Sequence, residues 1–319
     1  MANIRITMNG CMETGKKVQV LLSTYNGEKY LRQQLESIVA QTIFPEVSVL
    51  IRDDGSDDGT KEILKEYEAR YNFEVFYGKN LGISKSYEWL MLHSSRNCAF
   101  FALCDQDDLW LPNKLEIACA VLAKHDSNSP LLYVGRSRIT DEKLNSIGVS
   151  VKPQRISFYN AMVQNVCPGH NQVFSKSLMD YLIRTSIGSA YVVDWWVYLT
   201  ASGIGEIVFD DRFFTLHRQH GHNAVGYMIS PFKQLILRTK RLFGNEASAI
   251  TKQLKAFYDC CSLSLPVEYR NEIGLFIQSQ RSVTTRLQYV RTAKIYRQGK
   301  METLILKGLY VLGKYKIRT

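Results

Sequence analysis

The sequence contains no apolar run long enough to cross a membrane. Its longest apolar stretches, such as VQVLLS and LILKGLYVLG, are shorter than the roughly 18–20 residues that a bilayer requires or are interrupted within that length. The first residues, MANIRITMNGCMETGKK, are too polar for a secretory signal. We therefore expect residues 1–16 to form a loose leader and the protein to be cytoplasmic.

Paired cysteines are also missing. The seven cysteines are odd in number and include no C-x-x-C pair, whereas disulfide frameworks and thiolate zinc sites use paired cysteines. We expect reduced cysteines within the core.

Three common site signatures are absent. The sequence has no G-x-G-x-x-G fingerprint, no G-x-x-x-x-G-K-[ST] phosphate loop and no G-x-S-x-G nucleophile turn. These absences argue against the usual dinucleotide-binding, P-loop and serine-hydrolase patterns.

Acidic residues are scarce near the end of the chain. The 319 residues carry a net charge of +10, and 45% are apolar, which is enough for a sizeable core. Residues 228–319 hold 17 Lys and Arg but 5 Asp and Glu, a net charge of +12, whereas residues 1–227 carry −2. This asymmetry indicates two regions with different functions.

From residue 18 onward, strand-like runs alternate with helix-like ones. VQVLLS, VSVLIR, FEVFY and AFFALC have strand character, and apolar residues at helical spacing separate them. This order predicts an α/β fold with a mostly parallel central sheet covered by helices on both faces. The strands become shorter and mixed after residue 112, and only helical spacing follows residue 227. We therefore expect one domain over 17–227 and a basic α-helical region over 228–319.

Polar residues follow each of the four strand-like runs. They occupy positions 24–27, 53–56, 80–82 and 105–108. Ligands of parallel α/β sheets bind beyond the carboxyl ends of the strands, so we expect one site to gather all four clusters.

The fourth cluster places three acids within four positions, Asp105, Asp107 and Asp108. Carboxylates this close repel one another, so we expect a positive group among them. Oxygen ligands suit Mg²⁺ or Mn²⁺, which bind through one or two carboxylates and substrate phosphates. Alternatively, Asp108 caps a helix that begins at Leu109, which would leave Asp105 and Asp107 unexplained.

The stretch DDGSDDGT at 53–60 resembles the start of a calcium loop. Lys65, however, stands where an EF-hand needs a glutamate. A turn followed by a helix capped near Thr60 explains the stretch better. This arrangement would leave Asp53 and Asp54 free to accept hydrogen bonds from a base or ribose.

Two later segments carry candidate functional residues. Asp194 lies between apolar and aromatic residues in VVDWWVYLT, and burial would suit it to act as a general base. It is also placed to cap a helix beginning at Trp195, and Trp195 and Trp196 are either core residues or a surface for a sugar ring. The histidines of TLHRQHGHN lie either in a surface loop or beside a phosphate, where Arg218 would offer a fork of donors.

Several segments together resemble family 2 glycosyltransferases of the nucleotide-diphospho-sugar transferase (GT-A) fold. They are LLSTYNGEKYLRQQLESIVAQT, IRDDGSDDGT, KNLGISKSY, LCDQDDLWLPNKLE, and DWW followed by HRQHGHNAVG. The resemblance covers residues 17–227, which would be the catalytic domain. The D-W-W and R-Q-H-G-x-N segments are similar to those of bacterial rhamnosyltransferases that extend polysaccharides, although His217 stands where an aromatic residue is frequent.

The resemblance implies a nucleotide pocket at the strand ends. Ser23, Tyr25 and Asp54 would hold the base of the nucleotide. Asn80 and Gly82 would line the same pocket.

The resemblance also implies the groups that act on the diphosphate and the sugar. Asp105 and Asp107 would form a D-x-D element, in which Asp107 binds a Mg²⁺ or Mn²⁺ ion on the diphosphate. Asp194 would take the proton of the acceptor hydroxyl, and Arg218 and His220 would close over the diphosphate. Such enzymes invert the anomeric centre by a single displacement.

The implied substrates are a nucleotide-diphospho-sugar, with dTDP-L-rhamnose favoured, and a lipid-linked or polysaccharide acceptor of O-antigen or capsule synthesis. The basic tail interleaves Leu, Ile and Tyr with charge, which favours an anionic membrane surface, at the inner face of the plasma membrane, over nucleic acid. The alternative is a helical packing region or dimer surface.

Two other functions stay open at this point. A nucleotidyltransferase would need a basic, glycine-rich loop near the first strand, which STYNGEKY lacks. A non-catalytic carbohydrate-binding protein on the membrane would keep the fold but would not need Asp194.

Overall fold

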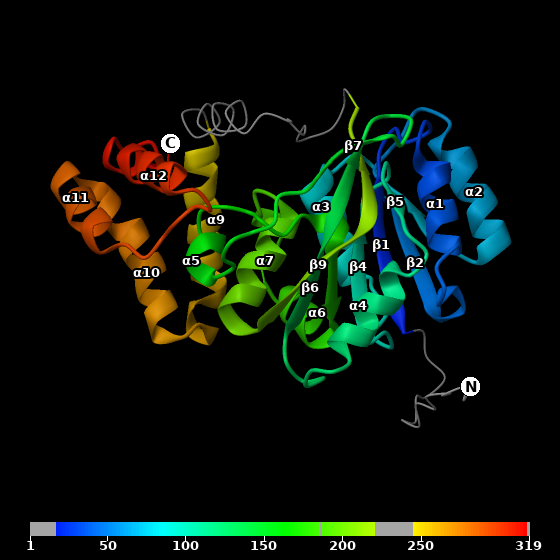
Figure 1. Ribbon diagram of the computed structural model, residues 1–319, viewed down its shortest axis with the longest axis horizontal. Helices are drawn as coiled ribbons and strands as arrows, with labels where there is room; N and C mark the ends of the chain where they lie inside the picture. Colours follow the sequence, from blue (N-terminus) through cyan, green and yellow to red (C-terminus); the bar gives the residue numbers. More distant parts are fainter. Residues whose placement is uncertain (1–16, 186, 221–244, 318–319) are drawn as a thin grey trace, which may run out of the picture.

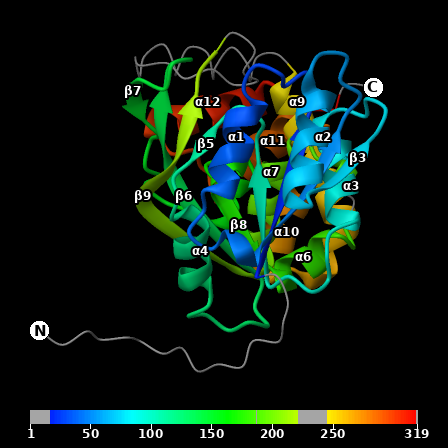
Figure 2. The same ribbon diagram turned by 90° about the vertical axis from the view of Figure 1, so that its right-hand side faces the viewer.

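A computed structural model describes residues 17–185, 187–220 and 245–317 (Figure 1). A central sheet is flanked by helices, with α1 and α2 at one end of the molecule and the C-terminal helices grouped at the other (Figures 1 and 2). The expected leader, 1–16, lies outside the described residues, as does His222. No helix in the described parts of the chain is long and apolar enough to span a bilayer.

The first half of the chain has the predicted order of elements. The strands are β1 (Val18–Thr24), β2 (Val47–Asp53), β3 (Glu74–Tyr77) and β4 (Phe100–Cys104). The helices between them are α1 (Leu31–Val39), α2 (Thr60–Tyr71) and α3 (Ile83–Leu92). The β-α-β-α-β-α-β pattern is therefore confirmed.

The elements that follow are mixed, as expected, but the strands are not all shorter: β6 and β9 have 10 and 13 residues, compared with 7 for β1. They are β5 (Leu109–Trp110), α4 (Lys114–Leu122), β6 (Leu131–Thr140), β7 (Ser146–Val149), α5 (Phe158–Ala161), β8 (Gln172–Ser175), α6 (Lys176–Leu182), α7 (Val193–Ile204) and β9 (Glu206–Arg218). Short 3-10 turns include η2 (Gly169–Asn171) and η3 (Ile187–Ser189). The strand-like stretches EIVF and FFTLHR are both part of the single strand β9.

The strands form one sheet, in the order β3-β2-β1-β4-β8-β6-β9-β5, and β7 pairs with β6 beside this path. The pairs within β3-β2-β1-β4 are parallel. Beyond β4, β6 and β9 are parallel, and the other pairs are antiparallel. The predicted α/β class is confirmed, and its parallel part brings the carboxyl ends of β1, β2 and β4 to one edge of the sheet.

Apolar side chains on the two faces of the sheet build two cores. One contains Val20, Leu22, Leu35 and Ile51, contributed by β1, β2 and α1. The other contains the buried residues of α7 and extends into the C-terminal helices. Because both faces of β1 are covered, six of its seven residues are buried instead of every second one.

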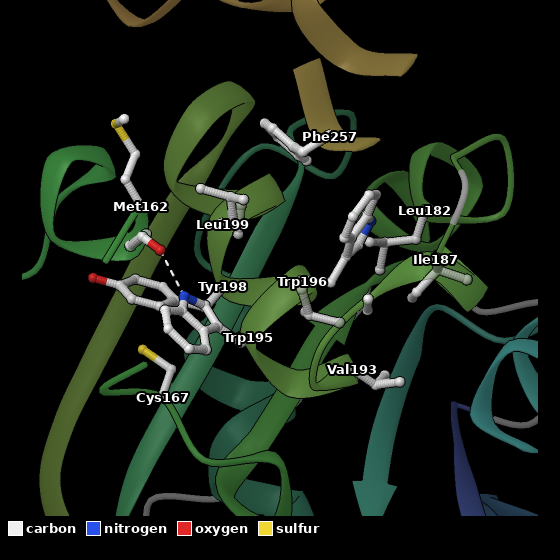
Figure 3. Packing of buried hydrophobic residues seen from close by; sticks show 14 of the residues in the cluster. Met162, Cys167, Leu182, Ile187, Val193, Trp195, Trp196, Tyr198, Leu199 and Phe257 are labelled. Atoms are coloured by element: carbon white, nitrogen blue, oxygen red, sulfur yellow. Dashed lines mark hydrogen bonds between the residues drawn. The ribbon is translucent and has the colours of Figure 1, made fainter. Parts of the chain in front are cut away.

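The C-terminal region is helical over its described residues, as predicted. It consists of α9 (Glu246–Cys261), α10 (Val267–Gln278), α11 (Val283–Thr292) and α12 (Lys300–Val311). Phe257 of α9 meets Trp196 of α7 edge to face, with ring centroids 5.4 Å apart (Figure 3). The helices therefore share a core with α7. The predicted division at 227/228 stays a prediction, because residues 221–244 lie outside the described parts.

Two local predictions are wrong. Asp108 does not cap a helix at Leu109, because Leu109 and Trp110 form β5 against β9, and α4 begins at Lys114 with Asn113 as its N-cap. Five of the six described cysteines are buried, but Cys260 is exposed at the end of α9, so the expectation of core cysteines fails there.

Candidate active site

The four polar clusters meet at the carboxyl edge of the parallel strands. The amide of Asp54 donates to the carbonyl oxygen of Thr24 over 2.8 Å, which joins the ends of β2 and β1. Gln106, after β4, accepts from the Thr24 hydroxyl at 2.6 Å and from the Tyr25 amide at 2.9 Å. The predicted gathering of these clusters is confirmed.

The acids after β2 are not free, contrary to prediction. Both are buried, and Asp53 accepts hydrogen bonds from the amide and hydroxyl of Ser56. Asp54 forms an ion pair with the buried guanidinium of Arg52 and accepts the amides of Leu81 and Gly82 at 2.9 Å each. Asp54 thus fixes the loop before α3, because buried carboxylates need such partners.

The other predicted nucleotide-pocket residues surround that loop. The Ser23 hydroxyl donates to Ser86 of α3 at 2.7 Å, and the Tyr25 side chain is 47% exposed beside the site. Gly82 has a φ of 79°, a conformation that side chains disfavour, and its amide also donates to Asn80 Oδ1 at 3.2 Å. The structure therefore brings Ser23, Asn80 and Gly82 around one loop.

Imidazoles lie against the acids after β4. His220 Nε2 lies 2.8 Å from Asp107 Oδ2, and His217 Nδ1 lies 2.8 Å from Asp108 Oδ1. Both histidine side chains are largely buried, with 8% and 18% exposure, so the surface-loop interpretation is wrong for them. They come from β9 and the residues after it, which pass beside β5.

Neighbouring acids in this cluster differ in proton affinity. Burial raises the pKa of Asp107 to about 6, and the charges of Asp108 and Asp105 add to the effect. Burial also disfavours ionisation of Asp108, but the positive charge of His217 outweighs it and holds the pKa of Asp108 at about 2. The same ion pair raises the pKa of His217 to about 9 against the opposing effect of its burial.

A third imidazole, His170 of η2, completes a possible set of metal ligands. Its ring stacks on that of His217 with centroids 4.3 Å apart. One donor atom from each of His170, His217 and Asp108 lies within 4.8 Å of the others. Asp108 Oδ2 is buried, lies 3.7 Å from His170 Nδ1 and has no hydrogen bond among the described residues. Since buried polar atoms normally have a partner, this oxygen fits a bound cation.

Asp105 is the most accessible acid of the cluster. Its side chain is 37% exposed, compared with 17% for Asp107, and its Oδ2 lies 3.6 Å from His170 Nδ1. The Tyr87 hydroxyl donates to the carbonyl oxygen of Cys104 at 2.8 Å and points toward Asp105 Oδ1 at 3.4 Å. Carboxylate and imidazole donors are ligands that Mn²⁺ and related ions accept, so the residues present fit a divalent ion.

Arg218 braces this cluster. Its side chain is 2% exposed and donates to the carbonyl oxygens of Asp107 at 3.0 Å and Glu142 at 2.5 Å, and to Gln33 Oε1 at 2.6 Å. The guanidinium also lies 4.5 Å from the centre of the Tyr30 ring. Arg218 thus ties β9 to the loop after β4, to α1 and to the turn after β6.

Asp194 lies in the first turn of α7, which begins at Val193. It does not cap a helix starting at Trp195, because the N-cap is Val192. Asp194 Oδ2 accepts the Gly169 amide at 2.8 Å, and Oδ1 is buried. Burial raises the pKa of Asp194 to about 6, and the charge of Asp105 adds to the effect, against the opposing hydrogen bonds from the Gly169 amide, the Trp195 backbone and the Asn165 side chain.

The two tryptophans after Asp194 belong to the core. Trp195 is 4% exposed and donates from Nε1 to the Ala161 carbonyl oxygen at 2.6 Å (Figure 3). Trp196 is fully buried and donates to the Thr185 hydroxyl at 3.1 Å. Neither indole presents a face to a sugar ring, so the core alternative is confirmed.

Sequence reasoning missed His170, Gln106 and Lys114. Lys114 is buried, donates to the His170 carbonyl oxygen and to Thr215 Oγ1, and lies over the Trp110 ring. Burial lowers the pKa of Lys114 to about 7. Gln106 lies within the predicted cluster 105–108, but nothing in the sequence shows that it would join β4 to β1, and His170 stands in CPGHNQ with no spacing that marks it as a site residue. Only the fold brings His170 to the acids.

Comparison with known sequences places this chain in a family. The profile described as glycosyl transferase family 2 matches residues 19–182, just over half of the chain. The chain belongs to glycosyl transferase family 2. A Rickettsia typhi protein described as an uncharacterized glycosyltransferase is 22% identical to this family 2 chain over 309 residues, covering 95% of it and 93% of the relative. The dTDP-rhamnosyl transferase RfbG of Shigella flexneri is 27% identical over 254 residues, covering 73% and 84%.

Solved structures share the fold of this family 2 chain. Residues 1–349 of S. aureus TarS with UDP-GlcNAc superpose with a TM-score of 0.53 at 16% identity, covering 93% of this chain and 90% of that one. The same TarS segment with UDP gives a TM-score of 0.55 over 94% and 89%. The likeness confirms the predicted GT-A type of fold: a mixed α/β domain with a curled central sheet.

Proposed function

We propose that Asp194 is the general base of an inverting sugar transfer. The observation that carries this proposal is the buried carboxylate of Asp194, which the Gly169 amide holds at 2.8 Å and which lies close enough to Asp105 to feel its charge. A carboxylate with a raised pKa accepts a proton well near neutral pH. The acceptor hydroxyl would pass its proton to Asp194 as its oxygen attacks the anomeric carbon.

The nucleoside diphosphate would lie along the strand ends, over the loop that Asp54 fixes. Ser23, Tyr25, Asn80 and Gly82 would contact the base and ribose, as the resemblance implies. Asp54 would act by holding the amides of this loop in place, because its own oxygens are already occupied.

Asp105 and Asp107 would hold the divalent ion of the donor, with His220 beside Asp107. Asp108, His170 and His217 offer a second, deeper donor set for such an ion. When bound, Mg²⁺ or Mn²⁺ neutralises charge on a departing diphosphate. Arg218 would position Asp107 through its backbone carbonyl while His220 closes over the diphosphate.

For the sugar we favour L-rhamnose from dTDP-L-rhamnose, supported by the similarity to RfbG, which is named for dTDP-rhamnosyl transfer. A panel of dTDP-rhamnose, UDP-sugars and GDP-sugars, scored by release of the nucleoside diphosphate, tests this choice. Faster release from UDP-GlcNAc than from dTDP-rhamnose would overturn it.

The acceptor would be a hydroxyl of a lipid-linked oligosaccharide in cell-surface polysaccharide synthesis, such as O-antigen or capsule. The basic C-terminal region supports this choice, since it would hold the protein on the anionic inner face of the plasma membrane. Extraction of the protein from membranes by high salt, with retention at low salt, is the expected behaviour.

The variant Asp194→Asn tests the base. It keeps the size of the side chain and removes the proton acceptor, so we expect transfer to fall by about 10²–10⁴-fold with donor binding unchanged. Asp180→Asn is the matched control, because Asp180 pairs with Lys176 on α6, apart from the site. Full-rate transfer by Asp194→Asn would remove the assignment and would favour a non-catalytic carbohydrate-binding protein.

A further inference from the structure

Strand β7 exposes apolar side chains on alternate residues. Ile147 and Val149 are 38% and 41% exposed, and Val151, just after the strand, is 67% exposed. Alternate residues of an extended chain point to the same side. Among the described strands β7 pairs with β6 alone, so it lies at the margin of the sheet.

This margin adjoins the active site. Thr140, the last residue of β6, pairs with Ser146 of β7 and with Arg218 of β9. Arg218 also donates to the carbonyl oxygen of Glu142 in the turn between β6 and β7. Only the turn between β6 and β7 therefore separates the apolar side chains of β7 from Arg218, which contacts the loop that carries Asp107.

The chain after β7 joins this margin to the C-terminal helices. The Gln154 amide donates to Gln298 Oε1 at 2.7 Å, and Gln298 Nε2 donates to the Arg155 carbonyl oxygen at 2.7 Å. The Arg155 guanidinium lies 4.8 Å from the centre of the Tyr296 ring. Residues just before α12 are thus fixed to the segment that follows β7.

Helix α12 carries a second row of exposed apolar side chains. Met301, Leu304 and Leu312 are 59%, 64% and 69% exposed. Gly308 stands between them with open space at its Cβ position. Spacings of three and four residues place all four on one face of the helix, and the opposite face buries Leu306, Leu309 and Tyr310.

Basic side chains surround both rows. Residues 294–317 contain six Lys and Arg and a single acid, Glu302, which already lies 3.5 Å from Arg297. Lys300 and Lys316 flank α12 and are exposed, as are Lys143 and Arg155 near β7. Apolar side chains set among cationic ones match the interface of a bilayer that contains anionic lipid.

The two elements that carry these rows lie toward the same edge of the molecule. β7 and α12 are near the top of Figure 1 and stay there in Figure 2, which is turned about the vertical axis. The N-terminal end of β1 is at the bottom, so the carboxyl ends of the parallel strands, where the acids gather, point to the same upper edge.

We propose that β7 and the exposed face of α12 together dock the protein on an anionic bilayer, with the active site opening toward the lipid surface. The inference rests on the proposed transfer to a lipid-linked acceptor. It adds that the acceptor reaches the active site from the bilayer surface. A long-chain lipid diphosphate would then present its sugar at the height of the site, without leaving the bilayer.

Vesicle flotation of the full chain tests the proposal, with phosphatidylcholine vesicles that contain or lack about 30 mol% phosphatidylglycerol. Two paired variants place charge on the rows, Val149→Asp with Val151→Asp, and Leu304→Asp with Leu312→Asp. Each pair is expected to lower partition to anionic vesicles about tenfold. Leu263→Asp is the matched control, because Leu263 is 92% exposed beside Ser264 and Leu265, which lie against the carboxyl end of α7, away from Asp194.

Equal partition of the unaltered chain to both vesicle types would overturn the proposal. Partition of either paired variant at the level of Leu263→Asp would also overturn it. Nucleoside diphosphate binding in solution, measured on the same proteins, should be unchanged by either pair. If the unaltered chain binds no nucleotide, the proposed transfer fails, while the vesicle result still decides the docking surface.

Discussion

Asp107 and Asp108 show how strongly the local environment can separate the pKa values of two adjacent carboxyl groups. Asp108 is fully buried against His217 and stays ionised, whereas burial and its acidic neighbours raise the pKa of Asp107. The repulsion expected from three nearby acids is thus relieved in part by imidazoles. The repulsion between Asp107 and its acidic neighbours is what a bound cation would offset.

The protonation of Asp194 predicts how the reaction depends on pH. Only the ionised carboxylate accepts a proton, and its pKa is raised to about 6. With saturating metal, kcat/KM should therefore fall about tenfold for each pH unit below 6 and level off above it. The residual rate of Asp194→Asn should lack this dependence, and an equally flat profile for the unaltered protein between pH 5 and 7 would contradict the assignment.

At the scale of elements, the short turn η2 holds the start of α7 in place. A Cβ atom added at Gly169 would lie 3.1 Å from Asp194 Cβ, so Asp194 must shift by a few tenths of an ångström to admit it. Misplacement of a reacting group by about 1 Å costs on the order of 10²-fold in rate. Gly169→Ala should therefore lower kcat by about three- to tenfold and leave donor affinity unchanged.

Gly308→Ala is the matched control for that substitution. Gly308 lies in α12 with no atom within 4 Å of its Cβ position, and alanine favours a helix over glycine by about 1 kcal/mol. We expect unchanged kcat in solution and slightly higher stability. Equal loss of kcat in both variants would show that α7 does not depend on contact with η2.

The spacing of apolar residues predicted the elements well where a strand is buried on both faces or a helix is buried along one face. The runs that became β1, β2 and β4, and the basic helices beyond residue 245, were predicted with the correct type. Prediction failed where a side chain takes a distant partner. Asp54 is occupied by amides that follow β3, and His170 reaches the acids only because η2 packs beside β4 and β9.

At the scale of the whole molecule, the catalytic domain and the C-terminal helices share one hydrophobic core over the described residues. Phe257 of α9 is fully buried among residues of α7 and α5. Removing its ring leaves a cavity, so Phe257→Ala should lower the free energy of unfolding by about 3–5 kcal/mol. Tryptophan fluorescence reports unfolding of residues 17–227, which contain all four Trp residues. Far-ultraviolet circular dichroism also reports unfolding of the C-terminal helices.

Both signals should change together in urea if the two regions share one core. Leu275→Ala is the control, since Leu275 of α10 is 52% exposed and its removal should change stability by less than about 0.5 kcal/mol. Separate transitions for the two signals would support the predicted division at 227/228 as independent domains.

The central claim is that the acids after β4 hold a divalent ion against the diphosphate of the donor. Calorimetric titration of the protein with dTDP, with and without Mn²⁺, tests it most directly on the unaltered chain and on Asp107→Asn. We predict that Mn²⁺ strengthens dTDP binding to the unaltered chain and that Asp107→Asn binds dTDP only at the metal-free level. The same gain in affinity from Mn²⁺ in both proteins would contradict the account.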